Sequence, residues 1–282
     1  MLKLGVQISI EGGIDQSIDR AVGLGCNTMQ VFIRNPRKFR RGSLKKEDIT
    51  VFNKKLKQSG ISPLIIHSSY TLNLATPKKF LHWITVKEFI ADLVEAEKIH
   101  ADYFVVHVGC HKGTTEEKGL NRVVKALKKI LKETPELKIN VLLENTAGMG
   151  TSLGHTFSHY RVIFEALAFP DRLGVCLDTA HAFSAGYTIN TPEGIEKLLA
   201  EVNDSVGVKR IKVIHLNDTA DECGSHKDRH VHIGQGNIGE AGFSCLINHA
   251  SFADVPLILE TPKNEDDDDK MNLETVKKLY IS

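Results

Sequence analysis

Six short apolar segments of this chain each end on a residue type that commonly binds metal ions. These segments are PLIIH, YFVVH, NVLLE, GVCLD, IKVIH and PLILE, and they end at His67, His107, Glu144, Asp178, His215 and Glu260. The intervals between these positions run from 34 to 45 residues. A strand followed by a crossover helix and its loops needs a little over thirty residues. The pattern therefore predicts a repeated βα unit, with all six side chains at one edge of the sheet.

The length of the chain suggests how many such units there are. Dividing 282 residues by eight gives about 35 residues for each unit, as in a (β/α)8 barrel. Two more strands are expected earlier in the chain, at Leu4–Ile10 and Thr28–Ile33. An open doubly wound sheet has the same alternation of strands and helices, but only a closed barrel gathers six successive strand ends around one axis. We therefore predict an α/β fold with one TIM barrel domain over residues 1–282 and a metal site at its C-terminal rim.

The segments between the expected strands have apolar residues at helical spacing. They include 14–22, 49–56, 81–96 and 120–130. Trp83 occupies an apolar position in the third of these segments, so we expect it in the core. The acidic run from Glu265 to Asp269 predicts a solvated loop before a last helix at Met271–Tyr280.

Composition favours a globular protein that does not interact with membranes. Hydrophobic residues make up 41% and charged residues 25% of the chain, with no apolar stretch near the roughly 18 residues of a membrane span. The segment MLKLGVQISI leads directly into the first expected strand without a targeting signal, so we expect a cytoplasmic location. Five cysteines without a close pair favour free thiols in a reducing compartment. We expect a monomer.

Three more residues of metal-ligand type follow the same strand ends. His181 lies three residues after Asp178, and Asp228 and His230 are two residues apart, which places them on one face of an extended segment. A lone histidine at a strand end is usually structural, but many buried ionisable groups close together are costly without a cation. The nine candidates are His67, His107, Glu144, Asp178, His181, His215, Asp228, His230 and Glu260.

Nine candidates exceed the three or four protein ligands that one zinc ion uses. They suit two or three ions, and five imidazoles favour zinc, with Mn2+ or Fe2+ as the alternative at one position. Adjacent metal ions are typical of enzymes that hydrolyse phosphoesters.

A basic loop is expected beside these groups. Residues 34–41 read RNPRKFRR, with five cations and one aromatic residue. The net charge is only +1, so any affinity for nucleic acid must arise from a local surface such as this one. Tyr70 follows the expected ligand His67 by three residues and could stack on a base or a sugar. This combination indicates that the phosphoester is a nucleic acid.

Longer segments around the candidate ligands form a recognisable set. They are FIRNPRKF (32–39), HSSYTLNLA (67–75), HVGCH (107–111), LLENTAG (142–148), LDTAHAFSAGY (177–187), HLND (215–218), GSHKDRHVHIGQGNIG (224–239) and LILETP (257–262). Together, in order and at matching spacing from the first strand to Pro262, they resemble the endonuclease IV family of zinc-dependent apurinic/apyrimidinic endonucleases of base excision repair.

The resemblance implies three zinc ions per chain. The first zinc would be held by His67, His107 and Glu144. The second would share Glu144 and add Asp178, His215 and Glu260, and the third would be held by His181, Asp228 and His230.

The resemblance also implies a reaction and a substrate. The phosphodiester 5′ to an abasic site in double-stranded DNA is hydrolysed, which leaves a 3′-hydroxyl and a 5′-deoxyribose phosphate. Glu144 and Glu260 are the implied catalytic residues, which orient the attacking water. Asn35, Arg37 and Tyr70 are the implied DNA contacts. Thr71 stands where a relative has a larger apolar residue, and Gln235 replaces a common glutamate.

Two other functions fit parts of the sequence. A sugar isomerase or epimerase on the same barrel would also place Glu, Asp and His at strand ends, but it needs only one or two ions and gives the basic loop no role. A sensor that binds damaged DNA without cutting it would use Tyr70 and the basic loop, but it does not explain a complete ligand set. The number of bound metal ions separates the first of these from the nuclease, and turnover separates the second.

Overall fold

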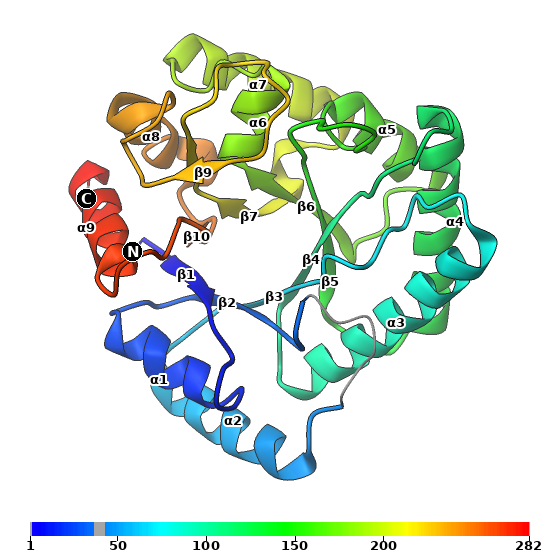
Figure 1. The fold of residues 1–282 in the computed structure, drawn as a ribbon, viewed down its shortest axis with the longest axis horizontal. Helices are drawn as coiled ribbons and strands as arrows, with labels where there is room; N and C mark the ends of the chain where they lie inside the picture. Colours follow the sequence, from blue (N-terminus) through cyan, green and yellow to red (C-terminus); the bar gives the residue numbers. More distant parts are fainter. Residues whose placement is uncertain (1, 37–42, 282) are drawn as a thin grey trace.

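Eight parallel strands close into a barrel in the computed structural model, which describes residues 2–36 and 43–281 (Figure 1). Neighbouring strands around the barrel follow the order β1, β2, β3, β4, β5, β6, β7, β10 and back to β1. Their bounds are β1 Leu4–Ile8, β2 Met29–Phe32, β3 Leu64–His67, β4 Tyr103–His107, β5 Asn140–Glu144, β6 Leu173–Asp178, β7 Ile211–His215 and β10 Leu257–Leu259. The predicted TIM barrel is confirmed. A separate antiparallel pair, β8 Asp218–Thr219 and β9 His230–Val231, lies outside it.

The strands end where the sequence predicts. Five of the six ligand-type residues are the last residues of their strands, from β3 to β7, and Glu260 follows β10 directly. The two N-terminal strands are shorter than expected, because β1 ends at Ile8 and β2 covers Met29–Phe32 only.

Helices form a ring outside the barrel, and the two chain ends lie side by side near β1 and α9 (Figure 1). Within the described residues, no helix is long and apolar enough to cross a membrane. The helices are α1 Gln16–Gly23, α2 Lys46–Ser59, α3 Lys79–Lys98, α4 Glu116–Glu133, α5 Phe157–Ala166, α6 Thr179–Ala185, α7 Pro192–Ser205, α8 Gly239–Ile247 and α9 Asp268–Leu279, with short 3-10 turns at Val208–Arg210 and Ala250–Phe252.

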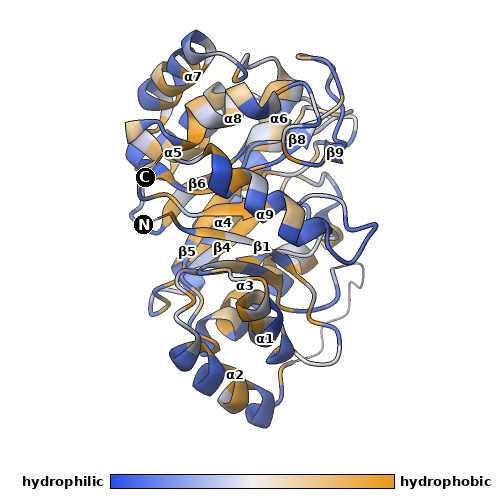
Figure 2. Ribbon diagram, turned by 90° about the vertical axis from the view of Figure 1, so that its left-hand side faces the viewer, coloured by the Kyte–Doolittle hydropathy of each residue, from blue (hydrophilic) through white to orange (hydrophobic). Residues whose placement is uncertain are grey.

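Helix α4 shows how local sequence produces these elements. Thr115 caps its N-terminus by accepting a hydrogen bond from the backbone N–H of Lys118 at 3.3 Å. The apolar residues that the periodicity places on one face are buried against the barrel; they are Leu120, Val123, Leu127 and Ile130. Figure 2 shows the resulting layers, with apolar strands in the middle and mixed helices outside.

Two sequence expectations about helices are wrong. Trp83 is 51% exposed rather than buried, because it lies on the outer face of α3, where its ring stacks on that of Phe80 at 6.1 Å. The last helix begins earlier than expected, so only residues 265–267 of the acidic run form an exposed segment before it. Asp268 and Asp269 form the first turn of α9, where carboxylates interact favourably with the unpaired N–H groups, and Asp268 accepts hydrogen bonds from the backbone of Asn264 and Glu265.

The barrel interior contains a separate apolar layer below the rim. Side chains two residues apart on a strand point to the same side. Each member of this buried layer lies two residues before one of the six ligand-type residues at the strand ends. The layer consists of Ile65, Val105, Leu142, Cys176, Val213 and Ile258. It closes the barrel floor, so the polar groups at the rim face an apolar base.

We expect the two buried thiols, Cys26 and Cys176, to be unreactive in the folded protein. Burial removes the hydration of the thiolate, and this raises the pKa of Cys26 to about 11 and that of Cys176 to about 12. Almost no thiolate therefore forms at neutral pH. All five cysteines are free, and Cys223 is exposed.

Thiol labelling tests whether Cys26 and Cys176 react more slowly than the other three thiols. A disulfide reagent such as DTNB should label at most three thiols per folded chain and all five in guanidinium chloride, as followed by absorbance. Rapid labelling of five thiols under native conditions would contradict the assignment of Cys26 and Cys176 as unreactive.

Candidate metal centre

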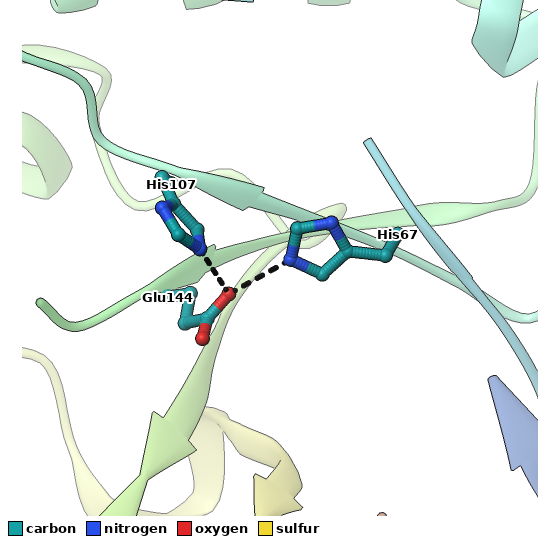
Figure 3. A group of neighbouring side chains, drawn as sticks. All are labelled: His67, His107 and Glu144. Atoms are coloured by element: carbon teal, nitrogen blue, oxygen red, sulfur yellow. Dashed lines mark hydrogen bonds and ion pairs between the residues drawn. The ribbon is translucent and has the colours of Figure 1, made fainter. Parts of the chain in front are cut away.

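The first group of candidate ligands joins three neighbouring strands. His67 ends β3, His107 ends β4 and Glu144 ends β5, and the register pairs His107 directly with Glu144. The Nε2 atoms of both histidines lie 3.1 Å from Oε2 of Glu144. Figure 3 shows the two rings pointing at this one carboxylate from different sides. Glu144 is fully buried, so its charge is balanced by these neighbours rather than by water.

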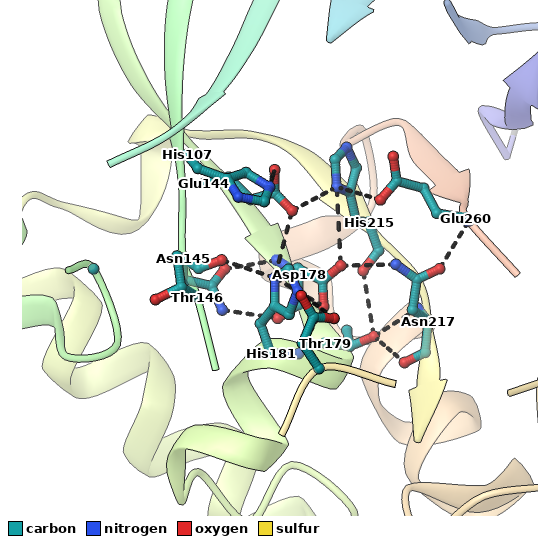
Figure 4. Close-up of polar contacts among 12 residues, drawn as sticks. His107, Glu144, Asn145, Thr146, Asp178, Thr179, His181, His215, Asn217 and Glu260 are labelled. Carbon is teal, nitrogen blue, oxygen red and sulfur yellow. Dashed lines mark hydrogen bonds and ion pairs between the residues drawn. The ribbon is translucent and has the colours of Figure 1, made fainter. Parts of the chain in front are cut away.

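A second group lies on the other side of the Glu144 carboxylate (Figure 4). The Nδ1 atom of His215 is 3.1 Å from Oε1 of Glu144, 3.4 Å from Oε2 of Glu260 and 3.9 Å from Oδ2 of Asp178. One ligand atom from each of these four residues lies within 4.8 Å of the others. Glu144 therefore offers one oxygen to each of two groups, as a carboxylate that bridges two cations does.

The third group is built at the start of α6. Asp178 is the N-cap residue of this helix, and its Oδ1 atom accepts a hydrogen bond from the backbone N–H of His181 at 2.7 Å. This cap explains the three-residue spacing, because it turns both side chains toward the rim. Asp178, His181 and His230 form a compact set of candidate ligands. Asp228 adjoins it, with Oδ1 at 3.1 Å from Nε2 of His181 and 3.5 Å from Nε2 of His230.

The hydrogen bonds of the rings decide which nitrogen atom of each histidine faces its group. In three of them Nδ1 lies next to a backbone carbonyl oxygen: His67 next to Ser68 at 2.8 Å, His181 next to Asn145 at 2.9 Å, and His230 next to Glu260 at 3.1 Å. A carbonyl oxygen only accepts, so in the neutral ring Nδ1 carries the hydrogen and Nε2 has the lone pair. This arrangement is usual for histidines that bind metal ions.

One ring nitrogen provides a direct test of whether a cation fits. The Nε2 atom of His230 is buried and has no hydrogen-bond partner within residues 2–36 and 43–281. An unsatisfied buried nitrogen is costly unless something binds its lone pair. Its two nearest charged neighbours are the carboxylates of Asp228 and Asp178. Two carboxylates and an unsatisfied imidazole suit a bound divalent cation, so these donors fit the metal that the sequence predicts.

The electrostatics of these side chains support this view. Burial alone would raise the pKa of Glu144, but the neighbouring His107 and His215 outweigh it and hold that pKa well below its usual range. Burial alone would lower the pKa of His181, but Asp178 and Asp228 raise it well above the usual value. The carboxylates and the rings are therefore electrostatically coupled, and a divalent cation held among them would supply positive charge in place of ring protons.

Two asparagines, which sequence reasoning did not single out as site residues, hold the ligands in place (Figure 4). Asn145 accepts a hydrogen bond from the backbone N–H of Asp178 at 2.6 Å and donates one to the carbonyl oxygen of Asp178 at 2.9 Å. Asn217 donates to Oδ2 of Asp178 at 2.7 Å and accepts from the backbone N–H of Glu260 at 2.8 Å. Asn145 directly follows Glu144, and Asn217 lies two residues after His215. This closeness in sequence to candidate ligands is the signal that could have identified both asparagines.

Asp218 organises the segment that carries the third group. Its buried carboxylate accepts five backbone N–H hydrogen bonds, at 2.8 to 3.3 Å, from Thr219, Gly234, Gly236, Ile238 and Gly239. A Cβ atom on Gly236 would lie 2.4 Å from Oδ1 of Asp218. Glycine is therefore required there because the backbone wraps closely around the carboxylate. Gly234 and Gly236 lie in the turn before α8, and Gly239 is the first residue of that helix.

Of the three predicted DNA contacts, two lie in the described part of the chain. Tyr70 is 62% exposed, and its ring packs edge-on against Phe32 at 5.2 Å. Together with His107 and Glu260 it lines an open cavity of about 630 Å³ over the candidate ligands. Asn35 is exposed. Arg37 lies outside the described residues.

One cation of the basic loop has a different role from the one expected. Arg34 was counted among the groups that could hold phosphates, but the structure buries it. Its guanidinium group forms an ion pair with Asp92 of α3 at 2.9 Å. Arg34 therefore fixes the start of the loop to a helix, and it is not exposed to a ligand.

A second cluster of histidines lies at the start of α4 and α5. The carboxylate of Glu116 lies between His155 and His159, at 3.8 Å and 3.4 Å from their Nε2 atoms. The Nδ1 atom of His159 accepts a hydrogen bond from the backbone N–H of Gly154 at 3.0 Å. The hydrogen of the neutral ring is then on Nε2, where it can bond to Glu116 but leaves no lone pair for a metal. This cluster is a hydrogen-bonded link between two helices.

Comparisons with known proteins agree with this geometry. The family model described as "Xylose isomerase-like TIM barrel" matches residues 18–279. A protein named "Probable endonuclease 4" from Chloroflexus aurantiacus is 41% identical over 280 residues, covering 99% of this chain and 98% of that protein. Another of the same name from Halothermothrix orenii is 42% identical over 265 residues, covering 93% and 94%.

Solved structures separate the fold from the family. The crystal structure of endonuclease IV from Thermus thermophilus has a TM-score of 0.86 and 32% identity, and the match covers 98% of each chain. A D-tagatose 3-epimerase-like protein has a TM-score of 0.75 but only 19% identity, covering 99% and 97% of the chains, so it shares the fold alone. The two relatives and the Thermus thermophilus structure are each more than 30% identical to this chain, match almost its whole length and are named as endonuclease 4 or IV. The chain therefore belongs to the endonuclease IV family.

Proposed function

We propose that this protein is a zinc-dependent apurinic/apyrimidinic endonuclease of DNA repair. It hydrolyses the phosphodiester 5′ to an abasic site in double-stranded DNA and leaves a 3′-hydroxyl and a 5′-deoxyribose phosphate. The observation that carries this proposal is the set of three adjoining donor groups, two of which share the Glu144 carboxylate. The names of the relatives support it.

Each donor group would hold one ion. His67, His107 and Glu144 would hold the first, and Glu144, Asp178, His215 and Glu260 the second. The third would lie among His181, Asp228 and His230, next to the unsatisfied Nε2 atom of His230. When bound, zinc supplies Lewis-acid stabilisation of the phosphodiester oxygens and lowers the pKa of water toward neutrality. Mn2+ or Fe2+ at one position is the alternative.

The chain's own residues would orient the reacting groups. Glu144 and Glu260 lie on either side of His215 and would accept the hydrogen bonds of the attacking water, which aligns it with the phosphorus. Tyr70 stands exposed beside the ligand His67, at 5.8 Å between ring centroids. It would stack against a nucleotide next to the abasic site, while Asn35 and Arg37 would contact the flanking strand. These contacts favour an abasic nucleotide turned out of the duplex, because unstacking costs least where the base is missing.

A sugar epimerase shares the fold but accounts for fewer of the donors. Proton transfer at a sugar carbon needs one or two ions, and the His181, Asp228 and His230 group would then have no role. The weak identity to epimerase structures adds only a likeness of fold. Metal content therefore separates the two functions, with three zinc ions per chain expected for the nuclease and one or two ions for the epimerase.

Incision of a defined duplex tests the reaction. The substrate is a duplex with one tetrahydrofuran abasic analogue, which has no aldehyde and so resists cleavage by elimination. We expect a cut 5′ to the analogue with a 3′-hydroxyl end that a DNA polymerase extends. Prolonged treatment with EDTA should abolish the cut, and added zinc should restore it. The same duplex with an ordinary nucleotide is the control.

Two results would contradict this proposal. The protein would be a lyase if it cleaved a natural abasic site in the presence of EDTA, left an unsaturated aldehyde and did not cleave the analogue. Tight binding of the abasic duplex without any cut, by protein that contains its full zinc complement, would show a sensor.

A further inference from the structure

Two glutamines occupy the barrel positions that complete the ring of polar side chains. Six strands bring a candidate ligand to the rim, and the remaining two, β1 and β2, bring Gln7 and Gln30. The register pairs these residues directly across the two strands. Gln30 is fully buried. A buried primary amide has two donor hydrogens and an acceptor oxygen to satisfy, so its partners reveal its role.

Gln30 contacts two members of one candidate metal group. Its Oε1 atom lies 2.9 Å from Nε2 of His215, and its Nε2 atom donates to Oε1 of Glu260 at 2.7 Å. The second hydrogen on that nitrogen goes to Oε1 of Gln7 at 2.9 Å. Both donor hydrogens and the acceptor of the Gln30 amide are thus used.

These contacts fix the orientation of the amide. A carboxylate can only accept, so the NH2 group of Gln30 must face Glu260, and the carbonyl oxygen must face His215. The oxygen then requires a hydrogen on Nε2 of His215. The lone pair is left on Nδ1, which is the atom that lies 3.1 Å from Glu144 and 3.4 Å from Glu260.

His215 differs from the other candidate ligands in this respect. The rings of His67, His181 and His230 are each held by a backbone carbonyl oxygen at Nδ1. His215 faces its group with the opposite nitrogen and depends on a side-chain amide 185 residues away in sequence.

We propose that Gln30 is a positioning residue for the second metal ion, and that Gln7 holds its amide in the required orientation. The inference rests on the metal centre of the proposed function. Gln30 sets the ring nitrogen that His215 presents and the direction of the Glu260 carboxylate, without touching the ion. Removing such a partner typically lowers metal affinity by about 10- to 100-fold.

The test compares zinc affinity in variants of similar side-chain volume. Gln30→Met removes the hydrogen bonds to His215 and Glu260, whereas Gln30→Glu keeps an acceptor for His215 but places a second carboxylate against Glu260. Gln58→Met, on the exposed side of α2, is the matched control. Affinity is measured by competition with a chromophoric chelator, and bound zinc is counted by elemental analysis after dialysis.

We expect Gln30→Met to lower the affinity for one zinc ion per chain by about 10- to 100-fold. The affinities for the other zinc ions, and all zinc affinities of the Gln58→Met control, should match the wild type. In the zinc-loaded wild type, 15N NMR should show a slowly exchanging hydrogen on Nε2 of His215, and Gln30→Met should lose that protection. Gln30→Glu should keep the protected hydrogen on Nε2 of His215, but it should still lower the affinity for the same zinc ion because its carboxylate repels that of Glu260.

Each contrary result is distinguishable. Wild-type zinc affinity together with a protected Nε2 hydrogen in Gln30→Met would overturn the inference. If circular dichroism shows that Gln30→Met does not fold, Gln7→Leu is tested instead. This variant keeps Gln30 but removes the hydrogen bond between the two amides. It should lower the affinity for the same zinc ion by a smaller factor. Wild-type protein that binds zinc but does not cut the abasic duplex would overturn the proposed function and leave this inference standing.

Discussion

Replacing Glu144 with glutamine is expected to reduce incision of an abasic duplex by more than about 10³-fold, since loss of a single stabilising donor in an active site already costs about 10² to 10³. The two oxygens of Glu144 face different groups, and an amide presents only one oxygen and one NH2 group. The NH2 group cannot bind a cation, so at least one ion of the first two groups should be lost. Incision rate under saturating DNA and zinc content by elemental analysis measure both effects.

The matched control for this change is Glu165→Gln, an exposed glutamate of α5. It makes the same chemical replacement away from the rim and should leave both quantities unchanged. A Glu144→Gln protein with a full complement of zinc and wild-type incision would show that the carboxylate does not bridge two ions.

Replacing Asp218 with alanine is expected to lower the free energy of unfolding by about 3 kcal/mol or more, because each buried N–H left without a partner costs about 1 to 3 kcal/mol. Five backbone N–H groups converge on this carboxylate. The segment that they hold carries Asp228 and His230, so one zinc ion should be lost as well. Urea unfolding followed by circular dichroism measures the stability.

Asp218→Asn sharpens this test because it has almost the same shape. Its NH2 group would face backbone N–H donors, so it should destabilise the protein nearly as much as alanine does. Asp254→Ala removes an exposed carboxylate and should change the stability by less than about 0.5 kcal/mol. A stable Asp218→Asn protein with three bound ions would show that these hydrogen bonds do not hold the segment.

Much of the site could be predicted because it follows from the position of residues on strands. A side chain at the end of a parallel strand must lie at the C-terminal edge of the sheet, and the alternation of strands and helices makes that edge the rim of a barrel. His107 and Glu144 are therefore neighbours as soon as the strands are known, as the register shows. Residues off the barrel strands were harder to place, and Asp228 and His230 were found from their spacing and from the family resemblance.

The remaining features depend on partners that are distant in sequence. Arg34 looked like a free cation of a basic loop, but Asp92 lies 58 residues away and buries it. Trp83 has an apolar type and a helical spacing that suit the core, yet the outer face of α3 is exposed. In each case residue type limits what a side chain can bond with, but it does not say which neighbour the fold will supply.

The sequence by itself determined the barrel, the rim and the six candidate ligands at the strand ends, because strand periodicity and parallel topology leave a strand-ending side chain only one edge to occupy. Only the tertiary structure decided how those ligands are held. It showed that Glu144 presents its oxygens to two groups, that Gln30 contacts both His215 and Glu260, and that Asp218 gathers five backbone N–H groups. The physical reason is that a hydrogen bond is directional and short, so its partner is defined only once the chain has brought distant residues within about 3 Å.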